Sequence, residues 1–310
     1  MLIRNLIKVG GLLLTVVVAN SCSAVNQDIA IGQNTNDTES SPELEYGQVI
    51  LQSASDYVIV PVGVTVDSSY KRLLSSSDDK NISRSQIKSW ENFMATNLIF
   101  HHQNTDQTHL LLDRKAIIDR FDYLNPYWSS DRNKSSCYSE TQDSLISQLF
   151  IYQLIEQDTN QNGKLDSKDA DRGYISDLSG YNLRSITPEK TKLLQWECDQ
   201  KNNQIVLFTQ EELEKNTHYN SLDTIAAYLY NLIDNQLTRI TPLNTSLIKW
   251  KIDLNRSQIF LEIKQDTNKD RQFSSEDESS IIRFDLTNDS DILDVTNDEI
   301  IDQLKYLNSN

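Results

Sequence analysis

The chain has 310 residues and a formal net charge of −16 at pH 7, from 45 acidic side chains against 29 lysines and arginines. So acidic a protein is repelled by the phosphates of nucleic acids and anionic membranes, which argues against both as direct partners and favours cations or basic partners. Thirteen tyrosines, four tryptophans and eight phenylalanines are enough to build a substantial core.

The N-terminus has the order of a secretory signal peptide, which we place at residues 1–21. Arg4 and Lys8 precede an apolar run from Val9 to Ala19. This run is too short for a membrane-spanning helix, which needs about 20 apolar residues. We therefore expect an exported protein.

The segment Ala19-Asn20-Ser21-Cys22 resembles the lipobox of bacterial lipoproteins, whose cysteine is lipidated and becomes the new N-terminus. Lipoboxes usually carry Leu three residues before the cysteine and a small residue two before it, where this chain has Ala19 and Asn20. The resemblance implies a lipid anchor at Cys22 in the outer membrane of a bacterial cell envelope. The alternative is ordinary cleavage after Ser21 or Ala24, which would leave a periplasmic protein.

Residues 22–44 are rich in Asn, Gln, Asp, Thr and Ser, so we interpret them as a flexible tether to a domain over residues 45–310. That domain contains two further cysteines, Cys137 and Cys198. In an oxidising compartment they are expected to form a disulfide, and the alternative is two unpaired thiols.

An internal repeat with a period of 54 is the strongest pattern in the chain. It aligns Trp196 with Trp250 and Ile186-Thr187-Pro188 with Ile240-Thr241-Pro242, and it is clear over about residues 145–290. A weaker fourth copy is suggested upstream, where Gln103–Asp106 falls one period before Gln157–Asn160. A period in this range predicts a solenoid or a propeller.

One repeat unit contains four short apolar runs separated by turn residues. The expected strands are Leu193–Asp199, Gln204–Gln210, Thr224–Leu232 and Gln236–Thr241. Four strands per unit is the content of a propeller blade, so we predict an all-β, propeller-like array of about four or five blades. A β-sandwich built from the same hairpins is the alternative.

The segment Tyr174–Pro188 and the following Trp196 strand resemble the blade repeat of TolB-type periplasmic β-propellers. The resemblance covers about residues 145–286 and implies a ring of blades that serves as a binding platform. Two features depart from the family: the chain has only eight glycines, and an acidic loop lengthens each repeat.

The acidic loop Asp158–Asp169, which we call the first loop, reproduces the twelve-residue calcium loop of EF-hand and dockerin modules. Gly163 stands at position 6, where a sharp turn needs it, and an apolar residue stands at position 8. Oxygen ligands are expected from Asp158, Asn160, Asn162, Lys164 through its carbonyl group, Asp166 and Asp169. The flanking segments have the pattern of strands, so a helix–loop–helix sensor is not expected.

A further copy, which we call the third loop, lies two periods downstream at Asp266–Asp277. Its expected ligands are Asp266, Asn268, Asp270, Gln272 through its carbonyl group, Ser274 and Asp277. Arg271 replaces the glycine at position 6, where a non-glycine residue with positive φ costs roughly 1 kcal/mol, so weaker binding is expected. The middle loop, Glu212–Asp223, carries glutamates at positions 1 and 3 that would crowd an ion, and we interpret it as an empty loop.

These patterns predict a calcium-binding, non-catalytic lipoprotein of the cell envelope with an unknown protein or envelope partner. The alternative is a metal-dependent hydrolase, for which His101, His102 and His109 could join Asp106 or Asp113 around a transition metal. Adjacent residues on a strand point to opposite faces, which disfavours that alternative.

Overall fold

The computed structural model describes residues 44–51, 54–65, 93–124, 137, 144–211, 223–270, 272–287 and 292–308. The expected signal peptide, Cys22, nearly all of the tether and most of the middle loop lie outside the described residues. Within the described part of the chain, no helix is long and apolar enough to cross a membrane.

The described chain forms four antiparallel sheets, named A to D in chain order. Sheet A contains β1 (Leu44–Tyr46), β2 (Ile50–Leu51), β3 (Tyr57–Thr65), β4 (Phe93–His102) and β5 (Thr108–Leu110). Sheet B contains β6 (Ile117–Tyr123), β7 (Leu149–Ile155), β8 (Asp171–Asp177) and β9 (Arg184–Ser185). Sheet C contains β10 (Thr191–Asp199), β11 (Gln204–Glu211), β12 (Thr224–Asn231) and β13 (Leu237–Arg239). Sheet D contains β14 (Thr245–Asp253), β15 (Gln258–Gln265), β16 (Glu278–Asp285) and β17 (Ile292–Asp294).

Two short helices accompany the sheets in the described chain. The 3-10 helix η3 (Leu145–Gln148) precedes β7, and the α-helix α2 (Asp298–Asn308) follows sheet D. The expectation of an all-β protein is confirmed, and the four strands expected of one repeat unit correspond to β10–β13 with small differences at their ends.

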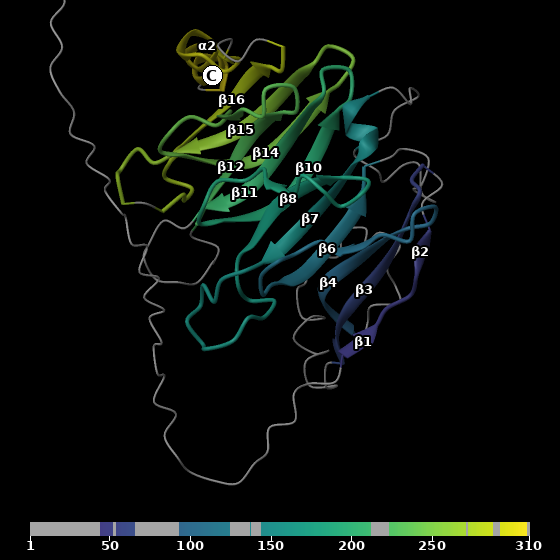
Figure 1. Ribbon diagram of the computed structural model, residues 1–310. Helices are drawn as coiled ribbons and strands as arrows, with labels where there is room; N and C mark the ends of the chain where they lie inside the picture. Colours follow the sequence, from purple (N-terminus) through teal and green to yellow (C-terminus); the bar gives the residue numbers. More distant parts are fainter. Residues whose placement is uncertain are drawn as a thin grey trace, which may run out of the picture. The chain divides into compact units, whose positions relative to one another are not determined.

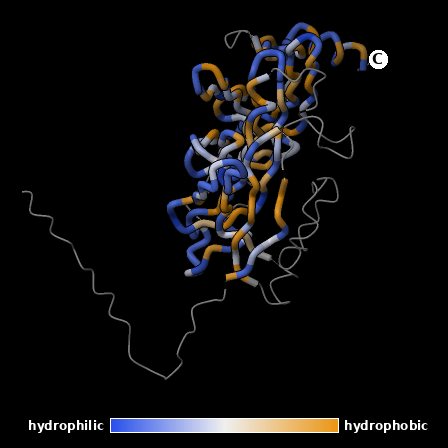
Figure 2. Tube along the Cα trace, turned by 45° about the vertical axis from the view of Figure 1, so that its right-hand side comes forward, coloured by the Kyte–Doolittle hydropathy of each residue, from blue (hydrophilic) through white to orange (hydrophobic). Residues whose placement is uncertain are grey.

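The sheets follow one another in space as they do in sequence (Figure 1). β4 contacts β6, β8 contacts β10 and β12 contacts β14, so the third strand of one sheet lies against the first strand of the next. Each of these three contacts buries a separate hydrophobic cluster. Hydrophobic and hydrophilic residues alternate along much of the chain, as expected when each strand has one buried face (Figure 2).

The recurring Ile-Thr-Pro motif connects the end of a sheet to its third strand. The threonine hydroxyl accepts the main-chain N–H group of a third-strand residue, Thr187 from Gly173 and Thr241 from Ala227, and Thr296 does the same for Ile281 in sheet D. Two more hydroxyl groups then donate to the proline carbonyls, Thr191 to Pro188 and Thr245 to Pro242. The motif therefore forms hydrogen bonds at the point where one unit ends and the next begins.

The structure contains a fourth unit, but in a register different from the one that the sequence predicted. Gln103–Asp106 lies in the turn between β4 and β5, whereas Gln157–Asn160 lies between β7 and β8. A fourth unit does exist as sheet A, in which the Leu98 carbonyl accepts the Leu111 N–H group and so corresponds to the Gly173 carbonyl of sheet B. These two positions are separated by more than one period because a long segment lies between β6 and β7.

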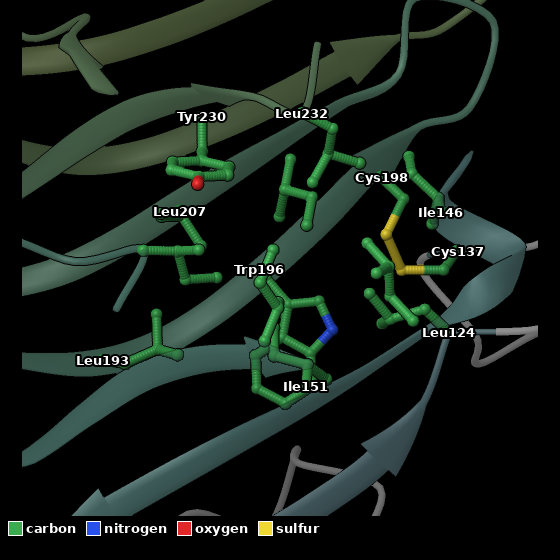
Figure 3. Close-up of a cluster of buried hydrophobic side chains, with 14 of the residues drawn as sticks. Leu124, Cys137, Ile146, Ile151, Leu193, Trp196, Cys198, Leu207, Tyr230 and Leu232 are labelled. Atoms are coloured by element: carbon green, nitrogen blue, oxygen red, sulfur yellow. A yellow bond between two sulfur atoms is a disulfide. The ribbon is translucent and has the colours of Figure 1, made fainter. Parts of the chain in front are cut away.

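A disulfide links Cys137 to Cys198 on β10, with 4.6 Å between their Cα atoms. Both cysteines are buried in the cluster between sheets B and C, beside Trp196 and Leu124 (Figure 3). The bond attaches the segment between β6 and η3 to sheet C.

Candidate metal-binding loops

The two loops predicted to bind calcium occupy the same place in their sheets. Asp158–Asp169 lies in the connection from β7 to β8, and Asp266–Asp277 in the connection from β15 to β16. Both connections join the second strand of a sheet to the third. Strands flank both loops, as the sequence predicted, so neither loop belongs to a helix–loop–helix unit.

The first loop is organised by side-chain oxygens that accept main-chain N–H groups. Asp158 Oδ1 accepts the N–H group of Asn162 at 3.0 Å, and Asp158 Oδ2 accepts that of Gly163 at 2.6 Å. Asn160 Oδ1 also accepts from Asn162, and Asn162 Oδ1 accepts from Lys164 at 2.9 Å. Gly163 has φ +83°, as its place at the sharp turn requires.

Asp169, at position 12, closes the loop from the inside and has no exposed surface. Its Oδ1 atom accepts the N–H groups of Thr159 and Asn160 at 2.8 and 3.1 Å. Its Oδ2 atom accepts the N–H group of Asp166 at 2.9 Å. One buried carboxylate therefore fixes both ends of the loop.

The third loop repeats this arrangement. Asp277 Oδ1 accepts the N–H group of Thr267 at 3.2 Å, and its Oδ2 atom accepts that of Ser274 at 2.8 Å. These N–H groups lower the pKa of the Asp277 carboxyl. The bonds near the start of the loop also recur: Asp266 and Asn268 accept the N–H group of Asp270, and Asp270 accepts that of Gln272.

The backbone of the two loops also agrees at position 4. Gln161 and Lys269 both have positive φ, +56° and +62°. Position 6 of the third loop, Arg271, lies outside the described residues. Of the middle loop, the structure describes Asp223 at position 12. Asp223 is 5% exposed and is thus buried like Asp169 and Asp277, which hold position 12 in the other two loops.

The oxygen donors of the first loop match the preference of calcium for carboxylate, amide and main-chain oxygens. The described residues contain no group of three or more His, Cys, Asp or Glu side chains arranged to hold a metal ion. In the first loop the amide of Asn162 reaches Asp166 and donates to its Oδ2 atom at 3.0 Å. An ion at this loop would therefore rely on amide and main-chain oxygens beside the carboxylates.

Sequence reasoning missed a pair of charged clusters next to the loops. Glu156 on the loop side of β7 accepts from the hydroxyl of Tyr174 and from Arg114. In sheet C, Glu211 accepts from Tyr228 and Arg239 in the same manner. Burial and the neighbouring glutamate raise the pKa of Tyr228 to about 12.

The repeat period aligns the tyrosines of these clusters but not their glutamates. Tyr228 lies one period after Tyr174, whereas Glu211 lies one position beyond one period after Glu156. The strand pairing shows the difference directly: Tyr152 pairs with Tyr174 in sheet B, and Leu207 pairs with Tyr228 in sheet C. Residues of β7 therefore correspond in the structure to β11 residues that lie one position farther along the chain than the repeat period predicts.

The three histidines considered for a hydrolase site form no group that could hold a metal ion in the described part of the chain, although His101 Nε2 lies 3.8 Å from Asp106 Oδ1. His102 and His109 both contact the ring of Tyr57. His101 bonds through Nδ1 to the hydroxyl of Thr108 at 2.9 Å. His102 Nδ1 accepts the N–H group of Asn104, and His109 stacks on Tyr181 with 4.0 Å between ring centroids. His101 and His102, adjacent on β4, point to opposite faces of sheet A.

No family model and no curated protein matches the chain. Among solved structures it is similar to an acylaminoacyl peptidase from Pyrococcus horikoshii, with a TM-score of 0.33 and 8% identity over 82% of this chain and 32% of that one. A structure from a study of two prolyl endopeptidases also has a TM-score of 0.33 and 8% identity, over 80% of this chain and 26% of that one. The chain thus spans about a third or less of the length of these proteins.

Proposed function

We propose that the protein is a calcium-binding, non-catalytic module of the bacterial cell envelope, in which Ca²⁺ stabilises the hairpin loops of sheets B and D. The observation that carries the proposal is the hydrogen-bond scaffold shared by the two loops. At positions 1, 3, 5 and 12, side-chain oxygens of both loops accept main-chain N–H groups of their own loop. The same pattern of bonds therefore recurs at equivalent positions of two separate loops.

The scaffold prepares a loop for a hard cation. Asp158 and Asp169 stand at opposite ends of the first loop, and each is held by main-chain donors. An ion between them would neutralise two carboxylates and tie the end of β7 to the start of β8. Because no helix flanks the loop, binding has no helix to reorient, and its effect is stabilisation of the folded state.

The same proposal treats the four sheets as blades of a propeller-like array that presents a binding surface. The serial contact of third strand with first strand supports this interpretation, as does the four-stranded order of sheets B, C and D. The module would be held at the membrane by a lipid on Cys22. Its partner would be an unidentified protein or envelope component.

The test is calcium titration and thermal melting of wild type and of Asp158→Ala. At a free calcium concentration 100 times the dissociation constant, one site adds about 2.7 kcal/mol to the free energy of unfolding. The wild type should therefore melt several degrees higher in calcium than in chelator, and Asp158→Ala should lose most of that gain. Asp266→Ala should lose less, because Arg271 is unfavourable at position 6.

The matched control is Asp302→Ala, which removes an exposed carboxylate from α2 and should keep the full calcium response. Equal calcium stabilisation of wild type and Asp158→Ala would contradict the assignment of the loop. Tight binding of Zn²⁺ without binding of Ca²⁺ would contradict the function as a whole.

A further inference from the structure

The turn between β10 and β11 holds a buried carboxylate. Asp199, the last residue of β10, is 2% exposed. Both of its hydrogen bonds come from Asn202: the main-chain N–H group donates to Oδ1 at 3.3 Å, and the side-chain amide donates to Oδ2 at 2.6 Å. Within the described part of the chain, no lysine, arginine or histidine forms an ion pair with Asp199. Burial of a carboxylate is costly when no positive charge accompanies it.

The equivalent turn of sheet D shows which group accompanies this carboxylate elsewhere in the chain. Asp253 and Arg256 lie one repeat period after Asp199 and Asn202. The N–H group of Arg256 donates to Asp253 Oδ1 at 3.2 Å, and its guanidinium group donates to Oδ2 at 2.8 Å. This contact lowers the pKa of the Asp253 carboxyl. The two turns therefore share one pair of bonds, but a neutral amide in sheet C takes the place of a cation in sheet D.

An amide oxygen opposite Asp199 has no partner. Gln204, the first residue of β11, pairs with Asp199 across the hairpin, so the two side chains lie on the same face of sheet C. Gln204 is 8% exposed, and its Oε1 atom is buried without a hydrogen-bond partner. Two buried oxygen acceptors, one of them charged, therefore belong to one cross-strand pair.

This pair lies at the junction of sheets C and D. Side chains alternate along a strand, so Gln204 shares its face of β11 with Val206 and Phe208, which belong to the cluster between the two sheets. The amide of Asn202 also donates to the hydroxyl of Ser257 in the turn between β14 and β15, at 3.0 Å. Ser257 is 2% exposed. A positive group at this place would therefore be enclosed by both sheets.

We propose that Asp199 and Gln204 bind a hard monovalent cation, Na⁺ or K⁺, which takes the place that the guanidinium group of Arg256 has in sheet D. Carboxylate and amide oxygens are the ligands that hard cations prefer. A single carboxylate balances a single positive charge, so a monovalent ion suits the pair better than Ca²⁺. The site lies between the first and second strands of its sheet, at the opposite end of the second strand from the calcium loops, and it does not depend on calcium binding.

The test is urea unfolding of the full chain in KCl, NaCl or choline chloride, each at about 150 mM so that charge screening is equal. EDTA is present throughout and keeps Ca²⁺ from the loops. With a dissociation constant of about 10 mM, the bound cation should lower the unfolding equilibrium constant about 16-fold relative to choline, which is too large for a buried site. Asp199→Asn keeps the shape of the side chain but not its charge, and it should unfold equally in all three salts.

The matched control is Asp253→Asn, which removes the equivalent carboxylate of sheet D and should keep the full response to the cation, because Arg256 already neutralises Asp253. The circular dichroism spectra of Asp199→Asn and Asp253→Asn should equal that of the wild type. Stabilisation of the wild type by one of the two cations alone would support the proposal and identify the ion. Equal stability of the wild type in all three salts would overturn the proposal, as would a cation response that persists in Asp199→Asn.

Discussion

Asp169 fixes the shape of the first loop through hydrogen bonds to its main chain. Burial of a carboxylate is costly unless hydrogen bonds replace its lost hydration. Here three main-chain donors do so, from Thr159, Asn160 and Asp166. An ion bound between Asp158 and Asp169 would reinforce these bonds, which join the two ends of the same loop.

Glu197 on β10 gives a prediction about pH. Burial raises the pKa of Glu197 to about 7 from the ordinary value of 4.5, although Gln195 and Lys251 oppose the shift. Because the folded state binds this proton more tightly, the associated stability is complete below pH 4.5 and is lost as the pH rises through 7. Glu197→Gln should thus unfold with a free energy higher than that of wild type by about 1–3 kcal/mol at pH 8.

The measurement for Glu197→Gln is urea unfolding at pH 4.5 and at pH 8. At pH 4.5 the variant and the wild type should have nearly equal stability. The exposed Glu189→Gln is the control and should not gain stability on going from pH 4.5 to pH 8. A Glu197→Gln variant no more stable than wild type at pH 8 would show that the carboxylate is adequately solvated in the folded protein.

At the scale of the element, the sequence predicted strands correctly where the residue pattern is typical of a single kind of structure. Short apolar runs bounded by Asn and Asp predicted β10–β13. The two acidic loops lie between second and third strands, as their sequence context implied. Sheet A was harder, because β3 and β4 pair with each other although residues 66–92 lie between them. Pairing between distant strands leaves no local pattern in the sequence.

Two other features of the fold were not predicted from the sequence, for different reasons. The helix α2 was not expected, because its side chains make few contacts that would show as a regular buried pattern, and none is buried. The cluster of Glu211, Tyr228 and Arg239 joins residues from three strands, and only the fold brings them together. Because β7 and β11 are offset by one residue, the repeat period does not align Glu211 with Glu156, and the sequence did not show that the two clusters are equivalent.

The Ile-Thr-Pro motif yields a prediction at this scale. Thr187 is buried, and its hydroxyl accepts the N–H group of Gly173 at 3.1 Å. Thr187→Val keeps the shape of the side chain but leaves that N–H group without its acceptor, which costs about 1–3 kcal/mol. Thr238→Val on β13 changes a side chain that is only partly buried and should cost less than half as much. Equal effects in urea unfolding would show that the hydroxyl acceptor adds nothing.

At the scale of the molecule, the four sheets are joined in series. The third strand of each sheet contacts the first strand of the next, and each contact buries its own hydrophobic cluster. The described domain is therefore stabilised by contacts between neighbouring sheets.

The last prediction concerns the anchor. With a net charge of −16, the chain is repelled by anionic lipid head groups, so a lipid on Cys22 would be the main source of membrane affinity. Cys22→Ser should therefore move the protein from the membrane fraction to the soluble fraction of cells. Ser23→Ala, which keeps the cysteine, is the control and should stay in the membrane fraction. Unchanged fractionation of Cys22→Ser would show that the cysteine carries no lipid anchor.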